Sequence, residues 1–401
     1  MNQHHWRLPD GIDEVLPPDA RHLEQLRRDV LDLFHRWGYE YVIPPLIEYL
    51  ESLLVGSGHD LELQTFRMVD QQSGRMLGIR ADMTSQAARM DAHSLRTEST
   101  QRLCYAGTVV HANPAGVLES RIPLIVGAEL FGASAHDADV EVITLMVETL
   151  RCAGIANPVV ELGHVGIFRG IATAGGVEPE LEDELFRALQ RKSAPDIANL
   201  LARGGVAGPV AERIRLLPDL LGARSMLDTA RSALVGVGGK DEVGVARAID
   251  EVRAVADGLL VRCPDVTVRF DLCELSGYAY HTGTVFAAYD ADYGHALARG
   301  GRYDAIGARF GRARPATGFD FNLKRLPRAA RPDLAAAVRA PRLDDVPQVR
   351  RAALWDTIRR LRGEGTRVIS ALSGEESSPA VCDRELWWSR GSWQVRSIVG
   401  G

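Results

Sequence analysis

The sequence is poor in the features that mark secreted, redox-active or membrane-spanning proteins. Only 5 of its 401 residues are cysteines, and no two of them form a CxxC pair. An odd number of scattered cysteines is not a disulfide framework, so we expect reduced, buried thiols. No apolar run reaches the roughly 18 residues that cross a bilayer, and the first residues lack the apolar core of a signal peptide. We therefore expect a cytoplasmic protein that makes no membrane contact.

The sequence also lacks the charge and the motifs of several function classes. Lys and Arg total 47 against 53 Asp and Glu, a net charge of −6, and no basic run forms a stripe for nucleic acid. Neither HExxH nor GxSxG occurs, and the 11 histidines show no metal-ligand spacing. We expect no nucleic-acid partner, no metal site and no serine-hydrolase chemistry.

What is present is the composition of a folded globular protein. Hydrophobic residues make up 46% and charged residues 25%, close to the averages for such proteins. At roughly 150 residues per domain, the length predicts two or three domains. The chain is therefore long enough to build a large hydrophobic core.

The first half of the chain predicts an antiparallel sheet flanked by helices. Leu23, Leu26, Val30 and Leu33 have the spacing of one helix face, and Gly38 follows as a helix terminator. Segments 103–111 and 122–131 are predicted strands of a hairpin, and a second helix is predicted from residue 137 to 154. The expected fold class is α+β.

The second half predicts an insertion and a small terminal domain. Residues 165–258 have an almost entirely helical pattern, and strands are predicted again at 266–272, 284–289 and 317–323. We predict a core over residues 1–326, a linker over 327–341 that is rich in Arg, Pro and Ala, and a C-terminal α/β domain over 342–401. This domain is predicted to contain one helix and three short strands, with Trp387, Trp388 and Trp393 in its core; stacking of these three rings on bases is the alternative.

Several segments, taken in order, resemble one family, the histidyl-tRNA synthetases of class II. The resemblance covers residues 7–326 and implies a class II synthetase-like antiparallel sheet with an inserted helical subdomain. It also implies that residues 7–48 form a dimer contact. The segments that carry it are Leu8 to Pro17, Leu77 to Thr84, Gly127 to Gly132, Thr284 to Phe286, Gly300 to Asp304 and Ala316 to Phe319.

The chain departs from that family at the residues that perform its chemistry. The synthetases have Phe-Arg-x-Glu in their second motif, where this chain has Val109-Val110-His111-Ala112. A second arginine of the family, just before a Gly, is Ser276 here. Because preorganised positive charge is commonly worth several kcal/mol to a reaction that develops negative charge, we expect amino-acid activation to be lost. Of the third motif only Arg325 remains, and the C-terminal tail is unlike an anticodon-binding domain.

A synthetase-like core with these losses is similar to the regulatory subunits of ATP phosphoribosyltransferase. The segment from Arg102 to Gly107, together with His111 and Arg121, also resembles that family. This resemblance implies a subunit with no catalytic residue and no cofactor, which acts in the first step of L-histidine biosynthesis. Its implied partners are a short-form catalytic subunit, a second copy of the chain, and L-histidine as a feedback effector.

The same resemblance places five residues around histidine. Asp82 is expected on the amino group with Thr84 beside it, Glu129 and Tyr280 on the imidazole, and Tyr278 nearby. Carboxylates and hydroxyls accept hydrogen bonds from an ammonium group and a ring N–H. Simpler roles stay open: Asp82 and Thr84 as caps of the following helix, Glu129 as the partner of a buried arginine, and the two tyrosines as strand-edge aromatics.

Two further hypotheses about function and one about structure complete the sequence analysis. An active or degenerate histidyl-tRNA synthetase and a free histidine-binding sensor are the functional alternatives. Arg302, Tyr303 and Asp304 are interpreted as structural, because Gly300 and Gly301 are expected to turn the chain sharply and an arginine–aspartate pair would fix that turn.

Overall fold

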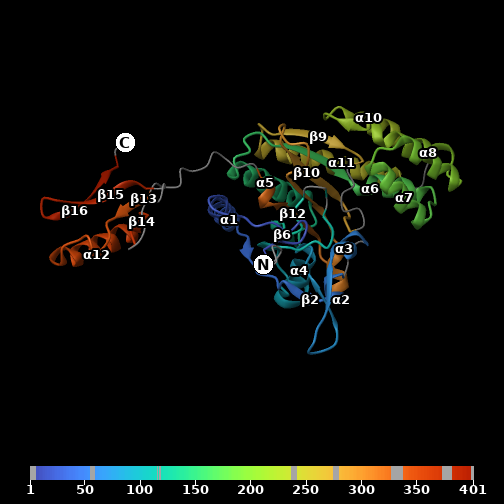
Figure 1. The fold of residues 1–401 in the computed structure, drawn as a ribbon. Coiled ribbons are helices and arrows are strands. Elements are labelled where there is room, and N and C mark those ends of the chain that lie inside the picture. The colour runs from blue at the N-terminus through green and yellow to red at the C-terminus, as the bar shows by residue number, and fades with distance from the viewer. Residues whose placement is uncertain are drawn as a thin grey trace. The chain divides into compact units, whose positions relative to one another are not determined.

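The protein is described from a computed structural model, which covers residues 6–54, 59–114, 116, 119–235, 242–273, 280–326, 337–372 and 382–398. The chain divides into two compact units, residues 1–329 and 330–401 (Figure 1). Each unit has a hydrophobic core of its own. No helix in these described ranges is both long and apolar enough to span a membrane.

A large sheet forms the centre of the first unit. Its strands are β1 (Glu40–Tyr41), β5 (Gln101–Thr108), β6 (Leu124–Phe131), β7 (Val159–His164), β8 (Leu221–Gly222), β9 (Thr267–Asp271), β10 (Thr284–Tyr289), β11 (Ala298–Arg302) and β12 (Ala316–Asn322). Over the described residues the order is β1-β5-β6-β12-β11-β10-β7-β9-β8. All neighbours are antiparallel except β1 with β5 and β7 with β9. The predicted antiparallel sheet, including the β5–β6 hairpin, is confirmed.

Amphipathic helices cover one face of this sheet. They are α1 (Asp19–Arg36), α5 (His136–Cys152) and α11 (Glu242–Arg262). Helix α1 buries Leu26, Val30 and Leu33, as their spacing predicts, and ends before Gly38, whose φ of 81° only glycine adopts readily. Helix α5 packs against β6, β10, β11 and β12, so the core of the unit lies between it and the sheet.

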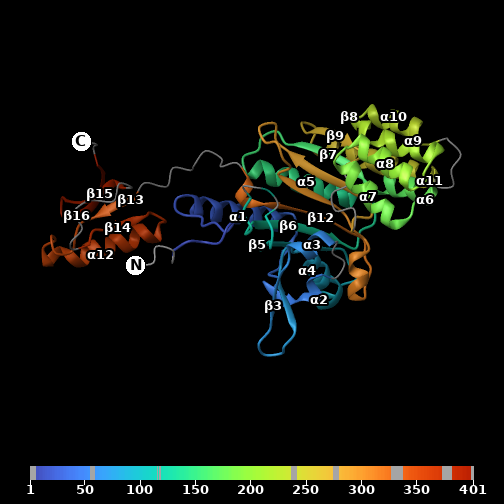
Figure 2. The same ribbon diagram turned by 45° about the vertical axis from the view of Figure 1, so that its right-hand side comes forward.

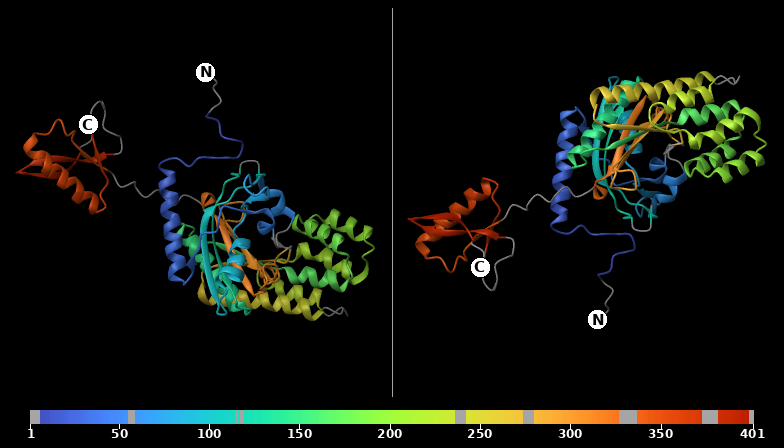
Figure 3. Two further views of the ribbon diagram at one scale, coloured as in Figure 1. Left: turned by 90° about the horizontal axis from the view of Figure 1, so that it is seen from below. Right: turned by 90° about the horizontal axis from the view of Figure 1, so that it is seen from above.

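The helical insertion follows β7. Its helices are α6 (Val165–Ala174), α7 (Pro179–Gln190), α8 (Ala194–Arg203), α9 (Gly208–Leu216), η2 (Leu217–Asp219) and α10 (Met226–Leu234). Figure 3 shows these helices, coloured green, gathered at one end of the large sheet. The structure adds two details to the predicted span of 165–258. Helix α11 continues to Arg262 and packs on both α5 and α6, and β8 leaves the insertion to extend the large sheet.

A second, small sheet was not predicted. It consists of β2 (Ile47–Tyr49), β3 (Phe66–Val69) and β4 (Met76–Ile79) in the order β2-β4-β3. The hairpin of β3 and β4 extends away from the large sheet (Figure 2). The remaining elements of this unit are α2 (Leu50–Leu53), α3 (His59–Gln64), α4 (Thr84–Arg89), η1 (Met90–Leu95), η3 (Ile306–Phe310) and η4 (Leu323–Arg325).

The second unit has a four-stranded sheet with one helix. The elements are β13 (Ala337–Ala340), α12 (Gln348–Gly363), β14 (Val368–Ser370), β15 (Cys382–Ser389) and β16 (Ser392–Ser397), with strand order β14-β13-β15-β16. The predicted linker over 327–341 is wrong at its C-terminal end, because β13 pairs with both β14 and β15. Val338 and Ala340 of this strand are buried in the same core as Leu354 and Ile358 of α12.

Two side-chain predictions need correction. None of the five cysteines forms a disulfide, as expected, but Cys152 is exposed and Cys382 is only partly buried. In the second unit, Trp388 and Trp393 pack edge to face with ring centres 5.4 Å apart. Trp387 is 47% exposed and lies beneath the guanidinium of Arg396 instead of in the core. Side chains alternate between the two faces of a strand, so two adjacent tryptophans cannot both face α12.

Candidate functional site

The candidate site lies on the face of the large sheet that α5 does not cover. Phe319 and Phe321 of β12 belong to the core beneath α1 and α5, so Gly318 and Asp320 face the other way. In the strand register, Glu129 of β6 lies opposite Gly318. The site is therefore built on the two central neighbours β6 and β12.

Glycines at positions 127 and 318 leave space on this face of the large sheet. A Cβ on Gly318 would collide with the carboxylate of Glu129, and a Cβ on Gly127 would lie 2.6 Å from the ring of Tyr105. A glycine inside a strand weakens it and marks the close approach of another group. Here the missing side chains leave space into which Glu129 and Tyr105 extend.

Glu129 is the most deeply buried of the predicted site residues, with 1% of its surface exposed. The hydroxyl of Tyr105 donates to its Oε1 atom at 2.8 Å, and the hydroxyl of Tyr303 donates to Oε2. The alternative that Glu129 pairs with a buried arginine is wrong. Burial raises the pKa of Glu129 to about 8, although the two hydroxyl donors act in the opposite direction.

Asp82 and Thr84 lie where β4 leads into α4. The guanidinium of Arg80, buried just before them, donates to the backbone oxygens of Thr108 and Pro44 at 3.0 and 2.6 Å and thereby anchors the loop. The Oδ1 atom of Asp82 accepts from the backbone N–H groups of Met83 and Thr84 at 2.7 and 3.2 Å. Asp82 therefore does cap the start of α4, while burial raises the pKa of its carboxyl.

The other predicted residues, Thr84 and Tyr280, line the same cavity as Glu129. The hydroxyl of Thr84 is 3.3 Å from that of Tyr105. Tyr280 packs edge-on against Tyr303 with ring centres 6.3 Å apart, and burial followed by the charge of Asp82 raises the pKa of its hydroxyl. The structure thus brings Asp82, Thr84, Glu129 and Tyr280 together. Tyr278 lies outside the described residues.

These side chains enclose a small cavity. Its free space is about 20 Å³ for the centres of water-sized spheres, which is room for roughly one water molecule. A ligand the size of an amino acid enters only if the lining side chains move apart. Within the described parts of the chain, no group of three or more His, Cys, Asp or Glu is placed to hold a metal ion. The lining residues are Thr84, Glu129, Tyr280, His281, Arg299, Gly300, Tyr303, Gly318, Phe319 and Asp320.

Sequence reasoning missed four of the residues that form the pocket. Tyr105 and Tyr303 hold Glu129, and Arg299 and Asp320 line the cavity. Tyr303 was interpreted as structural, and it also contacts Glu129 through its hydroxyl and lines the cavity. The signal that was available is the glycines inside predicted strands at 127 and 318, which indicate a surface that other groups approach closely. Gly300 and Gly301, which were predicted to turn the chain, lie instead inside β11 and pair with β10 and β12.

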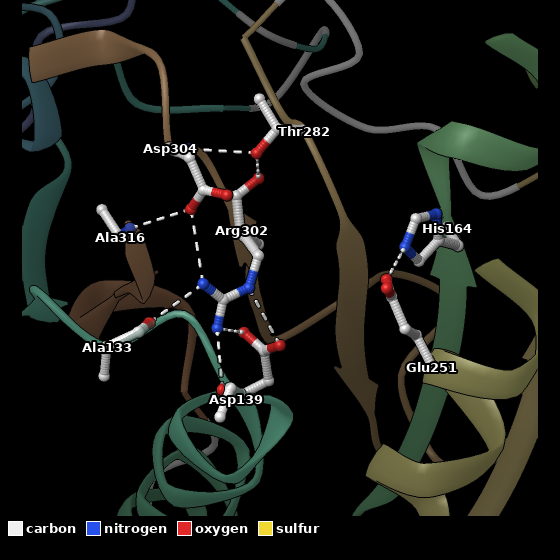
Figure 4. Close-up of polar contacts among 9 residues, drawn as sticks. Ala133, Asp139, His164, Glu251, Thr282, Arg302, Asp304 and Ala316 are labelled. Atoms are coloured by element: carbon white, nitrogen blue, oxygen red, sulfur yellow. Dashed lines mark hydrogen bonds and ion pairs between the residues drawn. The ribbon is translucent and has the colours of Figure 1, made fainter. Parts of the chain in front are cut away.

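Arg302 fixes the strand end that carries Tyr303 (Figure 4). Its guanidinium donates to Oδ2 of Asp139 at 3.1 Å and to the backbone oxygen of Ala133 at 3.1 Å, and contacts Oδ1 of Asp304 at 3.3 Å. Asp304 in turn accepts from the backbone N–H of Ala316 at 3.0 Å. These contacts join β11, β12 and the start of α5, which supports the structural interpretation of Arg302 and Asp304.

A second polar contact in Figure 4 ties the helical insertion to the sheet. His164, at the junction of β7 and α6, lies with its Nε2 atom 3.0 Å from Oε2 of Glu251 on α11. Its Nδ1 atom accepts from the backbone N–H of Gly166 at 3.0 Å, so the ring proton is on Nε2 and points to Glu251.

Glu129 gives a first prediction about stability and pH. Burial raises the pKa of Glu129 to about 8 in the folded chain, whereas an ordinary glutamate has a pKa of 4.5. The folded state therefore binds more protons than the unfolded state in this window, and stability falls as the pH rises through it. We expect Glu129→Gln to gain stability relative to wild type between pH 5 and pH 8, by about 1.4 kcal/mol or more, the equivalent of one pKa unit.

Urea unfolding followed by circular dichroism at both pH values measures this difference. Glu180→Gln, on the exposed side of α7, is the matched control and is expected to follow wild type at both pH values. A wild-type-to-Glu129→Gln difference that does not change with pH would contradict the buried, protonated carboxyl.

The positions of the lost synthetase arginines carry no positive charge. Val110 follows β5, and its backbone N–H donates to the backbone oxygen of Arg80 at 3.0 Å. Ser276 lies outside the described residues. Within the described residues, the position that corresponds to the arginine of the second synthetase motif therefore carries an aliphatic side chain.

Comparisons with known proteins agree with this geometry. Residues 11–326 match the family model of histidyl-tRNA synthetase, and residues 335–396 match that of the ATP phosphoribosyltransferase subunit HisZ C-terminal domain. A Pseudomonas fluorescens protein named ATP phosphoribosyltransferase regulatory subunit is 50% identical over 400 residues, covering 98% of each chain. A protein of the same name from Pseudomonas paraeruginosa is 49% identical over 400 residues, again covering 98% of each chain.

Solved structures show the same relationship. A crystal structure from Bacillus halodurans, described as an ATP phosphoribosyltransferase regulatory subunit/histidyl-tRNA synthetase, has a TM-score of 0.80 at 27% identity and covers 93% of this chain and 94% of its own. A histidyl-tRNA synthetase from Nostoc sp. has a TM-score of 0.74 at 16% identity over 92% of this chain and 87% of its own, which supports the fold alone. This chain therefore belongs to the family of ATP phosphoribosyltransferase regulatory subunits, which have the histidyl-tRNA synthetase fold.

Proposed function

We propose that this chain is a regulatory subunit without catalysis of its own, which assembles with a short-form ATP phosphoribosyltransferase catalytic subunit for the first step of L-histidine biosynthesis. In this proposal L-histidine binds the pocket around Glu129 and inhibits the complex. The observation that carries the proposal is that the pocket retains Glu129 between two tyrosine hydroxyls while Val110 occupies the position of an essential synthetase arginine.

The chemistry of Glu129 suits an imidazole in either protonation state. As a carboxylate it accepts a hydrogen bond from a ring N–H, and as a neutral acid it donates to the other ring nitrogen. A pKa of about 8 keeps both forms within reach near neutral pH. Tyr280 and Thr84 add hydroxyl groups to the same cavity.

The small size of the cavity supports a regulatory role. A ligand that fits only after the lining side chains separate binds one conformation of the chain better than the other. Such a differential affinity is what shifts a conformational equilibrium, and through it the activity of an attached subunit. The chain needs no reactive group of its own for this effect.

Self-association is part of the same proposal. Strand β1 is one end of the large sheet, and Tyr41, Ile43, Leu46 and Ile47, in and after it, are between 43% and 76% exposed. An exposed sheet edge flanked by apolar side chains is a surface that proteins cover. If two chains paired through this sheet edge across a two-fold axis, the edge would be covered in both chains. The assemblies would then contain an even number of these chains.

The cytoplasmic location predicted from the sequence belongs to this proposal as well. The proposed partner uses ATP, as its name states, and five cysteines that form no disulfide suit a reducing compartment.

The proposal is tested by assaying N1-phosphoribosyl-ATP formation by the catalytic subunit alone, with this chain, and with this chain plus L-histidine. We expect activity to rise at least tenfold in the second mixture and to fall again in the third. With Glu129→Gln, activation is expected to persist and inhibition to need at least ten times more histidine, because a hydrogen bond to a charged partner in a shielded site contributes roughly 1.5–3 kcal/mol.

Light scattering on the same mixtures follows assembly. Equal activity in all three mixtures, or two proteins that stay separate at micromolar concentration, would contradict the proposal and favour the free-sensor alternative. Activation without inhibition by histidine would contradict the effector role alone.

A further inference from the structure

Asp320 is the one carboxylate lining the cavity whose hydrogen bonds are unused. It lies on β12 directly opposite Arg299 of β11 and Gly127 of β6. Within the described part of the chain, its carboxylate accepts no hydrogen bond and forms no close ion pair. Asp320 is one of the residues that line the cavity.

The two other carboxylates of the site are already engaged. Asp82 accepts the backbone N–H groups at the start of α4, and Glu129 accepts two tyrosine hydroxyls. A carboxylate that is removed from most of the solvent and has no donor in the protein is costly, and water or a ligand supplies the missing partner. Asp320 therefore differs from both neighbours in needing a donor from outside the chain.

We propose that Asp320 binds the α-ammonium group of the ligand and so makes the pocket specific for an amino acid rather than for an imidazole alone. This inference rests on the proposed function, because it names a contact in the same histidine site. The resemblance to the synthetases assigns the ammonium group to the position of Asp82, whose oxygen here caps a helix. In this proposal Asp320 on β12 binds the ammonium group in place of Asp82.

The register of the strands supports this assignment. Gly318, opposite Glu129, and Asp320 are two residues apart on β12, which separates them by roughly 6.6 Å along the strand. This spacing is comparable with the length of a histidine from its ammonium group to its ring. Asp320 and Arg299, directly opposite each other, also present charges of both signs, as a zwitterionic head group requires.

The charges around Asp320 predict how binding depends on pH. The groups facing it are Asp82 before α4, Glu129 on β6, Arg299 on β11, and the side chains of Tyr105, Tyr280, His281 and Tyr303. Burial and the charge of Asp82 raise the pKa of Asp320 to about 7, and Arg299 acts in the opposite direction. Only the ionised form attracts an ammonium group, so histidine affinity is expected to fall as the pH drops below 7.

The test uses titration calorimetry on the complex of this chain with the catalytic subunit. The two ligands are L-histidine and imidazolepropionate, which has the same ring and carboxylate but no ammonium group. We expect Asp320→Asn to weaken histidine binding at least tenfold and to change imidazolepropionate binding less than twofold. Asp292→Asn, an exposed loop residue, is the matched control and is expected to bind both ligands like wild type.

Folding is checked by thermal unfolding, where Asp320→Asn is expected to be at least as stable as wild type because it removes an enclosed charge. Asp320→Ser serves as the second variant and is expected to show the same selective loss. Equal weakening of both ligands, or unchanged histidine affinity, overturns the role of Asp320 while the proposed function stands. A wild-type complex that does not bind histidine overturns the proposed function and this inference together.

Discussion

Replacement of Arg302 by alanine is expected to lower the free energy of unfolding by about 3–5 kcal/mol, the cost of leaving a buried charge without its partner. Arg302 and Asp139 are 7% and 3% exposed, and they form an ion pair at 3.0 Å. The guanidinium also donates to the backbone oxygens of Ala133 and Ala135 at 3.1 and 3.3 Å. In the alanine variant the carboxylate of Asp139 and the backbone oxygens of Ala133 and Ala135 all lose their hydrogen-bond donor.

The measurement is urea unfolding of the full chain followed by circular dichroism. Arg203→Ala is the matched control, because Arg203 pairs with Glu184 at the surface and such pairs contribute roughly 0–1 kcal/mol. The double variant Arg302→Met with Asp139→Leu is expected to recover a large part of the loss, since apolar side chains leave no buried charge behind. A loss below 1 kcal/mol for Arg302→Ala would contradict the buried network.

Histidine-dependent exchange of labelled pyrophosphate into ATP is expected to equal the rate without protein. The two arginines that the synthetases use correspond to Val110 and Ser276 in this chain. Removal of one preorganised donor from a developing negative charge typically costs about 10²–10³ in rate, so two losses predict a reduction of about 10⁴ or more. The exchange assay with an active histidyl-tRNA synthetase as positive control measures this.

The matched control is Glu129→Gln. Exchange above background in wild type that disappears in Glu129→Gln would contradict the loss of catalysis, because it would come from this pocket. Exchange that is equal in both proteins would point to a contaminating enzyme.

Much of the fold could be predicted from periodicity because long elements repeat one pattern many times. Helix α1 places apolar residues on one face, α5 is apolar along most of its length, and β5 and β6 form long strands around a turn-rich loop. The small sheet of β2, β3 and β4 was missed because its strands have only three or four residues, mostly exposed. Strand β13 was missed because four residues beside a Pro- and Arg-rich segment contain too few side chains to form a pattern.

The site was harder to predict because its contacts join distant parts of the chain. The resemblance supplied Asp82, Thr84, Glu129 and Tyr280, which the structure brings together. It did not indicate that Tyr303, 174 residues after Glu129, is bonded to it. Such a contact depends on which strands become neighbours, and this depends on the whole sheet rather than on any local stretch of sequence.

The place of β12 has a consequence for the growing chain on the ribosome. In synthesis β12 is the last strand of the first unit, but in the sheet it lies between β6 and β11. Before β12 has left the ribosome, β5 and β6, which carry Tyr105 and Glu129, are not joined through β12 to β11, which precedes Tyr303. The pocket is thus assembled only when translation passes residue 322. Prematurely terminated chains that end before β12 therefore contain no complete pocket.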